Sequence, residues 1–227
     1  MPLRANRKTP LPFADRAEAG RVLGTDLMQY ANRPDVVVLG LPRGGVPVAF
    51  EVAHALRAPL HPFVVRKLGV PGREELALGA IAAGGLCVVN ASLVRMLGLS
   101  EDAVAGIVRR AKSEVERRAQ LYYGGRPLPN LHNAVALVVD DGLATGATMR
   151  VAVAALRGHQ PARIVVAVPV GAPDTCRELE SEADAVVCAA RPEPFVGVGH
   201  WYADFAQTND AEVQVLLERR TDEADAR

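Results

Sequence analysis

Two adjacent carboxylates precede a short segment of small and hydroxyl-bearing residues. Asp140 and Asp141 follow the all-apolar run 135–139, and a helical pattern begins near Gly146. The unpaired N–H groups at a helix N-terminus bind phosphate, and threonine hydroxyls add donors. Carboxylates would repel that anion, but they accept hydrogen bonds from the two neighbouring hydroxyls of a ribose. The spacing therefore predicts a ribose 5-phosphate site, with the phosphate at Ala144, Thr145, Gly146, Ala147 and Thr148.

A second glycine-rich turn follows the apolar run 36–39. Arg43, Gly44 and Gly45 offer backbone N–H groups and a guanidinium, which suit the oxygens of a diphosphate. Each of the two turns also has a simpler interpretation without a ligand. The first would be a solvated strand-to-helix turn with capping side chains, and the second a tight turn. Their occurrence in one chain favours the binding interpretation.

The run Asp-Asp-Gly-Leu-Ala-Thr-Gly-Ala-Thr at 140–148 resembles the signature with which type I phosphoribosyltransferases bind phosphoribosyl pyrophosphate (PRPP). The Arg-Gly-Gly turn at 43–45 resembles their pyrophosphate loop, which often contains a non-proline cis peptide. The resemblance extends over residues 36–188. It implies displacement at C1 of PRPP by a nitrogen nucleophile, with release of pyrophosphate.

The resemblance also implies roles for individual side chains. The groups expected to be catalytic are Asp140, Asp141, Arg66 and Lys67. Mg²⁺ is expected to arrive with PRPP and to lie near the two aspartates, held mainly by substrate oxygens. Segment 65–75 resembles the stretch that leads into the family's flexible lid. Arg73 and Glu74 would move with that lid, and a solvated charged loop is the alternative for them.

Three further segments make the whole chain similar to a group of bacterial phosphoribosyltransferases whose acceptor is unassigned. They are Phe-Ala-Asp-Arg-Ala-Glu-Ala-Gly at 13–20, Gly-Gly-Arg-Pro at 124–127, and the aromatic segment 192–205. The expected partners are PRPP and an unidentified acceptor, such as a nucleobase, and a homodimer is common among relatives. A regulator that senses PRPP or a nucleotide on the same fold is the main alternative. The arginine and glycine turn favours an enzyme, because a sensor of a monophosphate needs no pyrophosphate loop.

The pattern of elements predicts how these groups are positioned. Short apolar runs alternate with helical patterns, which predicts an α/β fold with a parallel sheet flanked by helices, in a Rossmann-like arrangement. We expect a flexible arm at 1–12, a core domain at 13–190, and a tail at 191–227 that contributes a small hood. Trp201 and Tyr202 in that tail could stack on a planar acceptor or pack a small secondary core. Segment 66–75 is expected to be a long exposed loop.

Composition excludes several other classes of protein. The 227 residues include 26 basic and 26 acidic side chains, and this zero net charge argues against a nucleic-acid partner. The three cysteines have no C-x-x-C spacing, which indicates neither a disulfide framework nor a zinc site. There is no apolar stretch of membrane-spanning length and no signal-peptide pattern, so we expect a cytoplasmic protein without a membrane partner.

Overall fold

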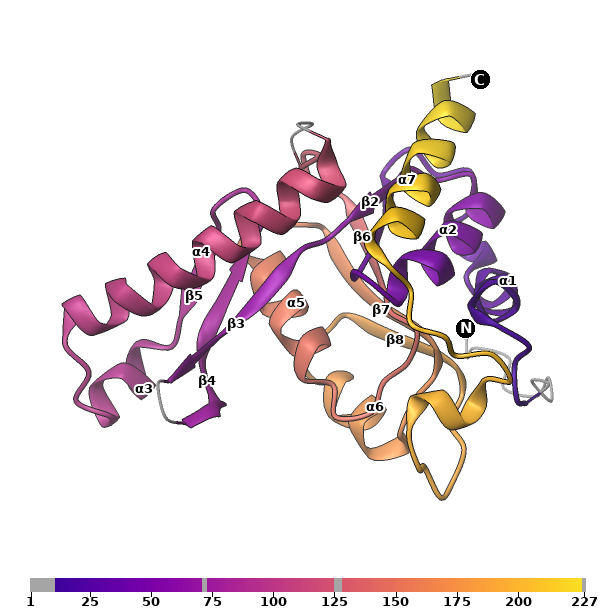
Figure 1. Cartoon of the computed structure of the whole chain (residues 1–227). Coiled ribbons are helices and arrows are strands. Elements are labelled where there is room, and N and C mark those ends of the chain that lie inside the picture. The colour runs from indigo at the N-terminus through magenta and orange to yellow at the C-terminus, as the bar shows by residue number, and fades with distance from the viewer. Residues whose placement is uncertain (1–10, 71–72, 125–127, 226–227) are drawn as a thin grey trace.

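A parallel five-stranded sheet forms the centre of the molecule (Figure 1). The computed structural model describes residues 11–70, 73–124 and 128–225. The strand order is β2-β1-β6-β7-β8, and all four neighbouring pairs are parallel. The strands are β1 (Val36–Gly40), β2 (Leu60–Pro62), β6 (Val135–Val139), β7 (Arg163–Val170) and β8 (Ala185–Ala190). The predicted fold class is therefore confirmed.

The central strands are apolar throughout because both faces of the sheet are covered. The covering helices are α1 (Arg16–Asp26), α2 (Gly45–Leu56), α5 (Ala147–Arg157) and α6 (Pro173–Leu179). Val36 and Val38 of β1 pack into one hydrophobic cluster with α1 and α2, whereas Val37 and Leu39 pack into a second cluster with α5 and α6. Successive residues of a strand point to opposite faces, so each strand supplies both clusters.

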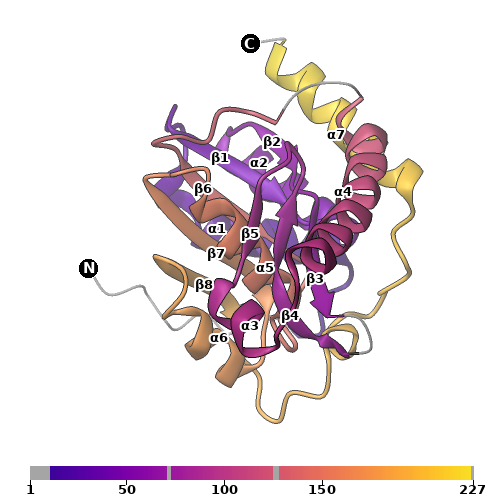
Figure 2. The same cartoon turned by 90° about the vertical axis from the view of Figure 1, so that its left-hand side faces the viewer.

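An antiparallel sheet and a long helix extend from one side of the core (Figure 1), and Figure 2 looks directly onto them. We call residues 65–123 the wing. Its elements are β3 (Val65–Val70), β4 (Arg73–Ala82), β5 (Cys87–Val89), α3 (Ala91–Met96) and α4 (Glu101–Tyr123). Helix α4 matches its prediction: the Ser100 hydroxyl accepts a hydrogen bond from the N–H of Ala103, and Gly124 ends the helix with a φ of 56°.

The exposed loop predicted over 66–75 is wrong. β3 and β4 pair as antiparallel strands there, with Val65 opposite Ala82 and Lys67 opposite Ala80. The hairpin forms because Leu68 and Val70, two residues apart, are buried in the same cluster as α4. Such alternation is the pattern of a half-buried strand, and the charged residues and Gly69 between these positions obscured it.

The start of the described chain and the tail segment around Tyr202 meet beside the sheet. Phe13 pairs with Tyr202, and Ala203 donates a backbone hydrogen bond to the Phe13 carbonyl. The chain then leads into α7 (Asp210–Asp225), which packs on α2. The tail thus has two parts, a segment near the N-terminal helix and a helix on the core. Ten of the twelve residues predicted as an arm, 1–10, lie outside the described residues. None of the described helices is long and apolar enough to cross a bilayer.

Candidate active site

The carboxylate pair lies directly beyond the end of β6. All five residues of β6 are buried, which fixes where the strand delivers Asp140 and Asp141. The N–H of Asp141 donates to Asp140 Oδ1 at 2.9 Å. Burial raises the pKa of Asp140 well above its usual range, and the negative charge of Asp141 adds to this effect. Burial also raises the pKa of Asp141, although Arg16 opposes the shift. The pair is thus held in surroundings that disfavour two negative charges.

One residue of α1 and one of the tail hold Asp141. Arg16 Nε donates to Asp141 Oδ2 at 2.9 Å, and the Tyr202 hydroxyl donates to the Asp141 carbonyl at 2.5 Å. The Arg16 guanidinium lies 3.9 Å from the centre of the Phe205 ring and donates to the Ala206 carbonyl at 2.8 Å. Arg16 is therefore fixed by the tail while it fixes Asp141. The sequence did not single out this residue, although both segments that meet here carried part of the family resemblance.

The predicted phosphate segment forms an open loop at the start of α5. Gly146 takes a left-handed conformation with a φ of 72° and has no side chain to cap the helix that begins at Ala147, whose N–H donates only a long hydrogen bond of 3.5 Å to the Thr145 hydroxyl. Below the loop, the Thr175 hydroxyl donates to the Ala144 carbonyl at 2.6 Å. The exposed residues of the segment are Ala144, Thr145, Ala147 and Thr148. The loop thus presents a helix N-terminus with weakly engaged N–H groups and two exposed hydroxyls, as an anion site requires.

The arginine and glycine turn lies against the carboxylate pair. A methyl group added to Gly44 would come within 2.1 Å of Asp141 Oδ2, and one added to Gly45 within 2.9 Å of the Asp140 Cα. The turn contains a cis peptide between Pro42 and Arg43, as the family resemblance implied. The glycines are needed because only a backbone without a side chain fits this close to the acids. The two predicted turns therefore belong to one site.

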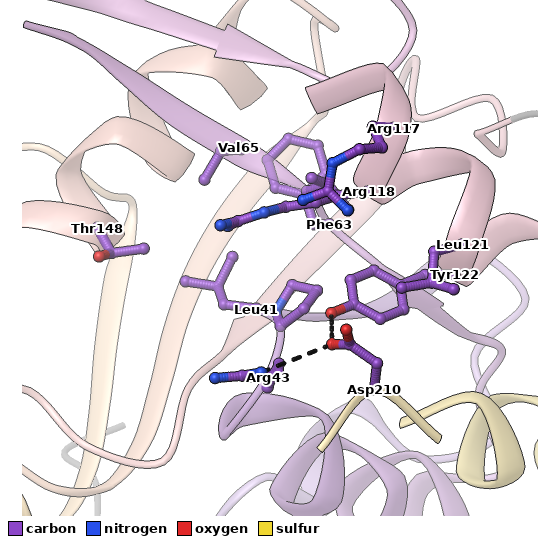
Figure 3. A pocket seen from close by; sticks show the side chains of 12 residues that line it. Leu41, Arg43, Phe63, Val65, Arg117, Arg118, Leu121, Tyr122, Thr148 and Asp210 are labelled. Carbon is purple, nitrogen blue, oxygen red and sulfur yellow. Dashed lines mark hydrogen bonds and ion pairs between the residues drawn. The ribbon is translucent and has the colours of Figure 1, made fainter. Parts of the chain in front are cut away.

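A cavity of about 410 Å³ adjoins this site (Figure 3). Arg43 lines it on one side, and Arg117 and Arg118 of α4 line it on the other. The Tyr122 hydroxyl donates to Asp210 Oδ1 at 2.6 Å, and Arg43 Nη1 lies 3.9 Å from the same oxygen. Burial, together with the Asp210 carboxylate, raises the pKa of Tyr122 to about 12, so its hydroxyl remains a donor at neutral pH.

Comparison with known proteins agrees with this geometry. A family model for the phosphoribosyl transferase domain matches residues 17–203. This chain belongs to the phosphoribosyl transferase domain family. A protein of Mycobacterium tuberculosis named "Putative phosphoribosyl transferase" is 47% identical over 207 residues, which are 91% of this chain and 46% of that protein. The chain therefore spans about half the length of this relative.

A solved structure and a second curated relative are also similar to this chain. The crystal structure of the protein TT1426 from Thermus thermophilus is 37% identical, with a TM-score of 0.84 over 92% of this chain and 99% of that chain. The uracil phosphoribosyltransferase of Aquifex aeolicus is 26% identical over 124 residues, which are 55% of this chain and 54% of that protein. The type I phosphoribosyltransferase fold expected from the sequence is thus confirmed.

The other predicted site residues belong to β3 and β4. Arg66 of β3 forms an ion pair with Glu114 of α4. Lys67 is the next residue of the strand, so its side chain leaves the opposite face. Arg73 and Glu74 open β4 instead of lying in a loop, and their side chains are outside the described residues. The structure therefore places these four residues on the wing.

The aromatic residues of the tail divide between packing and exposure. Tyr202 is only 5% exposed and packs against Phe13 and Phe205, with ring centres 5.6 and 5.0 Å away. It therefore belongs to a small secondary core, the second of the two alternatives that the sequence left open, and its ring is not available to stack on an acceptor. Trp201 lies beside Phe195 and is partly exposed, so its predicted stacking role stays open.

The oxygen donors of the site suit the magnesium ion that the family implies. No group of three or more candidate metal ligands occurs among the residues that the structure describes. Asp140 and Asp141 offer carboxylate oxygens beside a surface that fits phosphate groups. Mg²⁺ keeps several waters and is commonly bound through one or two carboxylates plus substrate phosphates. The residues therefore fit an ion that is shared with the substrate, and they do not form a complete protein cage.

Proposed function

We propose that this protein transfers the 5-phosphoribosyl group of PRPP to a nitrogenous acceptor and releases pyrophosphate. One observation carries this proposal: the carboxylate pair lies against the turn at 43–45 and is followed by the uncapped N-terminus of α5. The carboxylates thus lie between a surface for phosphate and a turn for diphosphate. The ribose of PRPP likewise lies between its 5-phosphate and its pyrophosphate.

Each part of the substrate has a proposed partner. The 5-phosphate binds residues 144–148, of which all but Gly146 are exposed, through backbone N–H groups and the two threonine hydroxyls. The ribose hydroxyls donate to Asp140 and Asp141, directly or through a water on magnesium. The pyrophosphate binds the backbone of Gly44 and Gly45 and the guanidinium of Arg43. When bound, Mg²⁺ would neutralise charge on the leaving pyrophosphate.

The protein's contribution to rate is positioning and charge management. Arg16 and Tyr202 hold the Asp141 segment in place before substrate arrives, which lowers the cost of ordering the site. Arg66 and Lys67 stay candidates for pyrophosphate contacts. In that role Arg66 would exchange Glu114 for the substrate as the wing closes. Closure would also exclude water, which would otherwise hydrolyse the sugar cation.

The substrate assignment is tested by calorimetry of PRPP binding in the presence of Mg²⁺. The double variant Asp140→Asn with Asp141→Asn is expected to lose binding by at least about 100-fold, because two charge-assisted contacts disappear. Asp174→Asn is the control, since that side chain is 82% exposed on α6. Unchanged binding in the double variant would refute the assignment of PRPP to this site.

The acceptor is tested by a screen for pyrophosphate release. Val198 packs directly on Gly142 beside the carboxylates, so the tail borders the place where an acceptor would lie. Uracil is included because the relative from Aquifex aeolicus is named for it, together with purines, orotate and small amines. Release with one compound identifies the acceptor. PRPP binding without release for any compound would favour a sensor on the same fold.

A further inference from the structure

Helix α4 carries two arginines that face the pyrophosphate turn across the cavity. Arg117 and Arg118 line the 410 Å³ space opposite Arg43, and Leu121 and Tyr122 line it one helical turn later (Figure 3). Residues four apart lie on one face of a helix, so the pattern 117, 118, 121, 122 turns a single face of α4 toward the cavity. Arg109 and Arg110 of the same helix do not line it.

The charges around this cavity are unbalanced. Three arginines line it, and Asp210 is its single acidic lining residue within the described part of the chain. Asp210 Oδ1 accepts the Tyr122 hydroxyl at 2.6 Å and lies 3.9 Å from Arg43 Nη1. Arg118 pairs with Glu114, which lies outside the lining, at 3.2 Å. For Arg117 the described residues provide no ion pair. The cavity thus holds an excess of positive charge.

Diphosphate is the anion that fits this arrangement. It carries several negative charges and many oxygens, and guanidinium groups bind phosphate oxygens in pairs. The turn at 43–45 reaches such a ligand from the sheet side only. Arginines on α4 would reach it from the opposite side, where the cavity is open to a ligand.

We infer that α4 provides the second half of the pyrophosphate site, where Arg117 and Arg118 bind the diphosphate opposite Arg43. Asp210 pairs with Arg43 until the diphosphate takes the place of the Asp210 carboxylate. This inference rests on the proposed function and adds residues that the PRPP motifs do not contain. Asp210 stands at the first residue of α7, so ligand binding also couples the tail helix to the site.

The inference is tested by titrating the full chain with inorganic pyrophosphate and Mg²⁺. The double variant Arg117→Gln with Arg118→Gln is expected to bind pyrophosphate at least about tenfold more weakly, as loss of charged hydrogen bonds requires. Arg109→Gln with Arg110→Gln is the matched control, because it removes the same charge from the same helix at exposed positions that do not line the cavity. The control is expected to bind like the wild type.

A second variant gives an effect in the opposite direction. Asp210→Asn keeps an oxygen that can accept the Tyr122 hydroxyl but removes the carboxylate that competes for Arg43. We expect pyrophosphate to bind about two- to fivefold more tightly, the size of an exposed ion pair. A merely structural role for Asp210 would weaken binding or leave it unchanged.

The outcomes separate the two proposals. If the wild type binds PRPP and pyrophosphate but the two arginine pairs give equal affinities, α4 is no part of the site and the inference is wrong. If Asp210→Asn does not bind pyrophosphate more tightly, Asp210 does not compete with the ligand for Arg43 and that part of the inference is wrong. If the wild type does not bind PRPP at all, the proposed function fails as well. Circular dichroism and denaturation midpoints of each variant show that the fold is intact.

Discussion

The two sides of the candidate site are stabilised in different ways. On the sheet side, Asp141 is held by Arg16, whose side chain is 12% exposed, and by Tyr202, which is 5% exposed. On the wing side, the Arg118 side chain is 50% exposed and its partner Glu114 is shared with Arg66. Helix α3 contributes no buried residue to the wing. The first side is fixed before a ligand arrives. On the second side, buried residues such as Tyr122 and Tyr123 anchor α4, but the ion pairs that its arginines make are exposed and individually weak.

This difference suits a reaction that needs both fixed geometry and closure. Phosphate and ribose must be placed accurately, so their partners belong on a packed part of the molecule. The leaving pyrophosphate must be covered and then released, which requires a side that can separate at low cost. Exposed ion pairs such as Arg66–Glu114 and Arg118–Glu114 exchange partners at low cost, and α3 at the far end of the wing has no buried residue that opposes local opening.

Gly44→Ala is expected to remove activity most strongly. The added methyl group would overlap Asp141 Oδ2 at 2.1 Å, so either the pyrophosphate turn or the acid must move. We expect kcat/KM for PRPP to fall by about 100- to 1000-fold, as when a fixed electrostatic contact is lost. Gly197→Ala is the control, since a methyl group there meets nothing within 4 Å. Equal activity of the two variants would show that the turn and the acid are not tightly fitted.

Arg16→Gln tests whether α1 and the tail segment together hold Asp141 in position. Loss of the guanidinium is expected to lower kcat/KM by about 10- to 100-fold, as is usual when a partner that orients a ligand-binding group is removed. It should also raise the pKa of Asp141, because Arg16 opposes the effect of burial. The pH at which PRPP binding appears would then shift upward. Arg21→Gln is the control, since that arginine lies on the same helix and is 59% exposed.

The origin of these residues shows what the sequence can and cannot predict. The strands 36–39 and 135–139 were predicted within one residue, because a run buried on both faces is apolar throughout. The site loops were predicted because their chemistry is contiguous. Arg16 was missed because its partner is 125 residues away, and no local pattern marks such a contact. The β3–β4 hairpin was missed because its buried positions alternate with charged ones.

Tyr202→Phe separates packing from hydrogen bonding in the tail. The ring would stay against Phe13, but the Asp141 carbonyl would lose its hydroxyl donor. We expect the free energy of unfolding to fall by about 1–2 kcal/mol, the cost of an unsatisfied buried acceptor. Tyr30→Phe is the control: that residue is also 5% exposed, and its hydroxyl makes no hydrogen bond within the described residues. Chemical denaturation of both variants measures the difference, and equal losses would contradict the assigned role.

Asp140→Asn is expected to stabilise the fold while it impairs function. The pKa of Asp140 is higher in the folded than in the unfolded chain, so this carboxyl costs stability as the pH rises from its ordinary pKa of 3.8 through the folded value. Asparagine removes that cost. We expect a gain of about 0.5–2 kcal/mol near neutral pH, as is common when a strained functional residue is replaced. Denaturation at about pH 4 and pH 8 should show the larger gain at the higher pH, and a loss at pH 8 would contradict the prediction.

Gly106→Ala gives the smallest effect and addresses the wing directly. Gly106 lies inside α4, and the nearest atom to an added methyl group is Arg110 Nη1 at 3.8 Å. Alanine should therefore stabilise the helix by about 0.5–1 kcal/mol without a clash. Hydrogen exchange of the α4 amides should slow, while PRPP affinity stays unchanged. A lower kcat in this variant would show that closure requires α4 to bend at Gly106. In that case the flexibility of the wing would reside in the helix itself as well as in its contacts with the core.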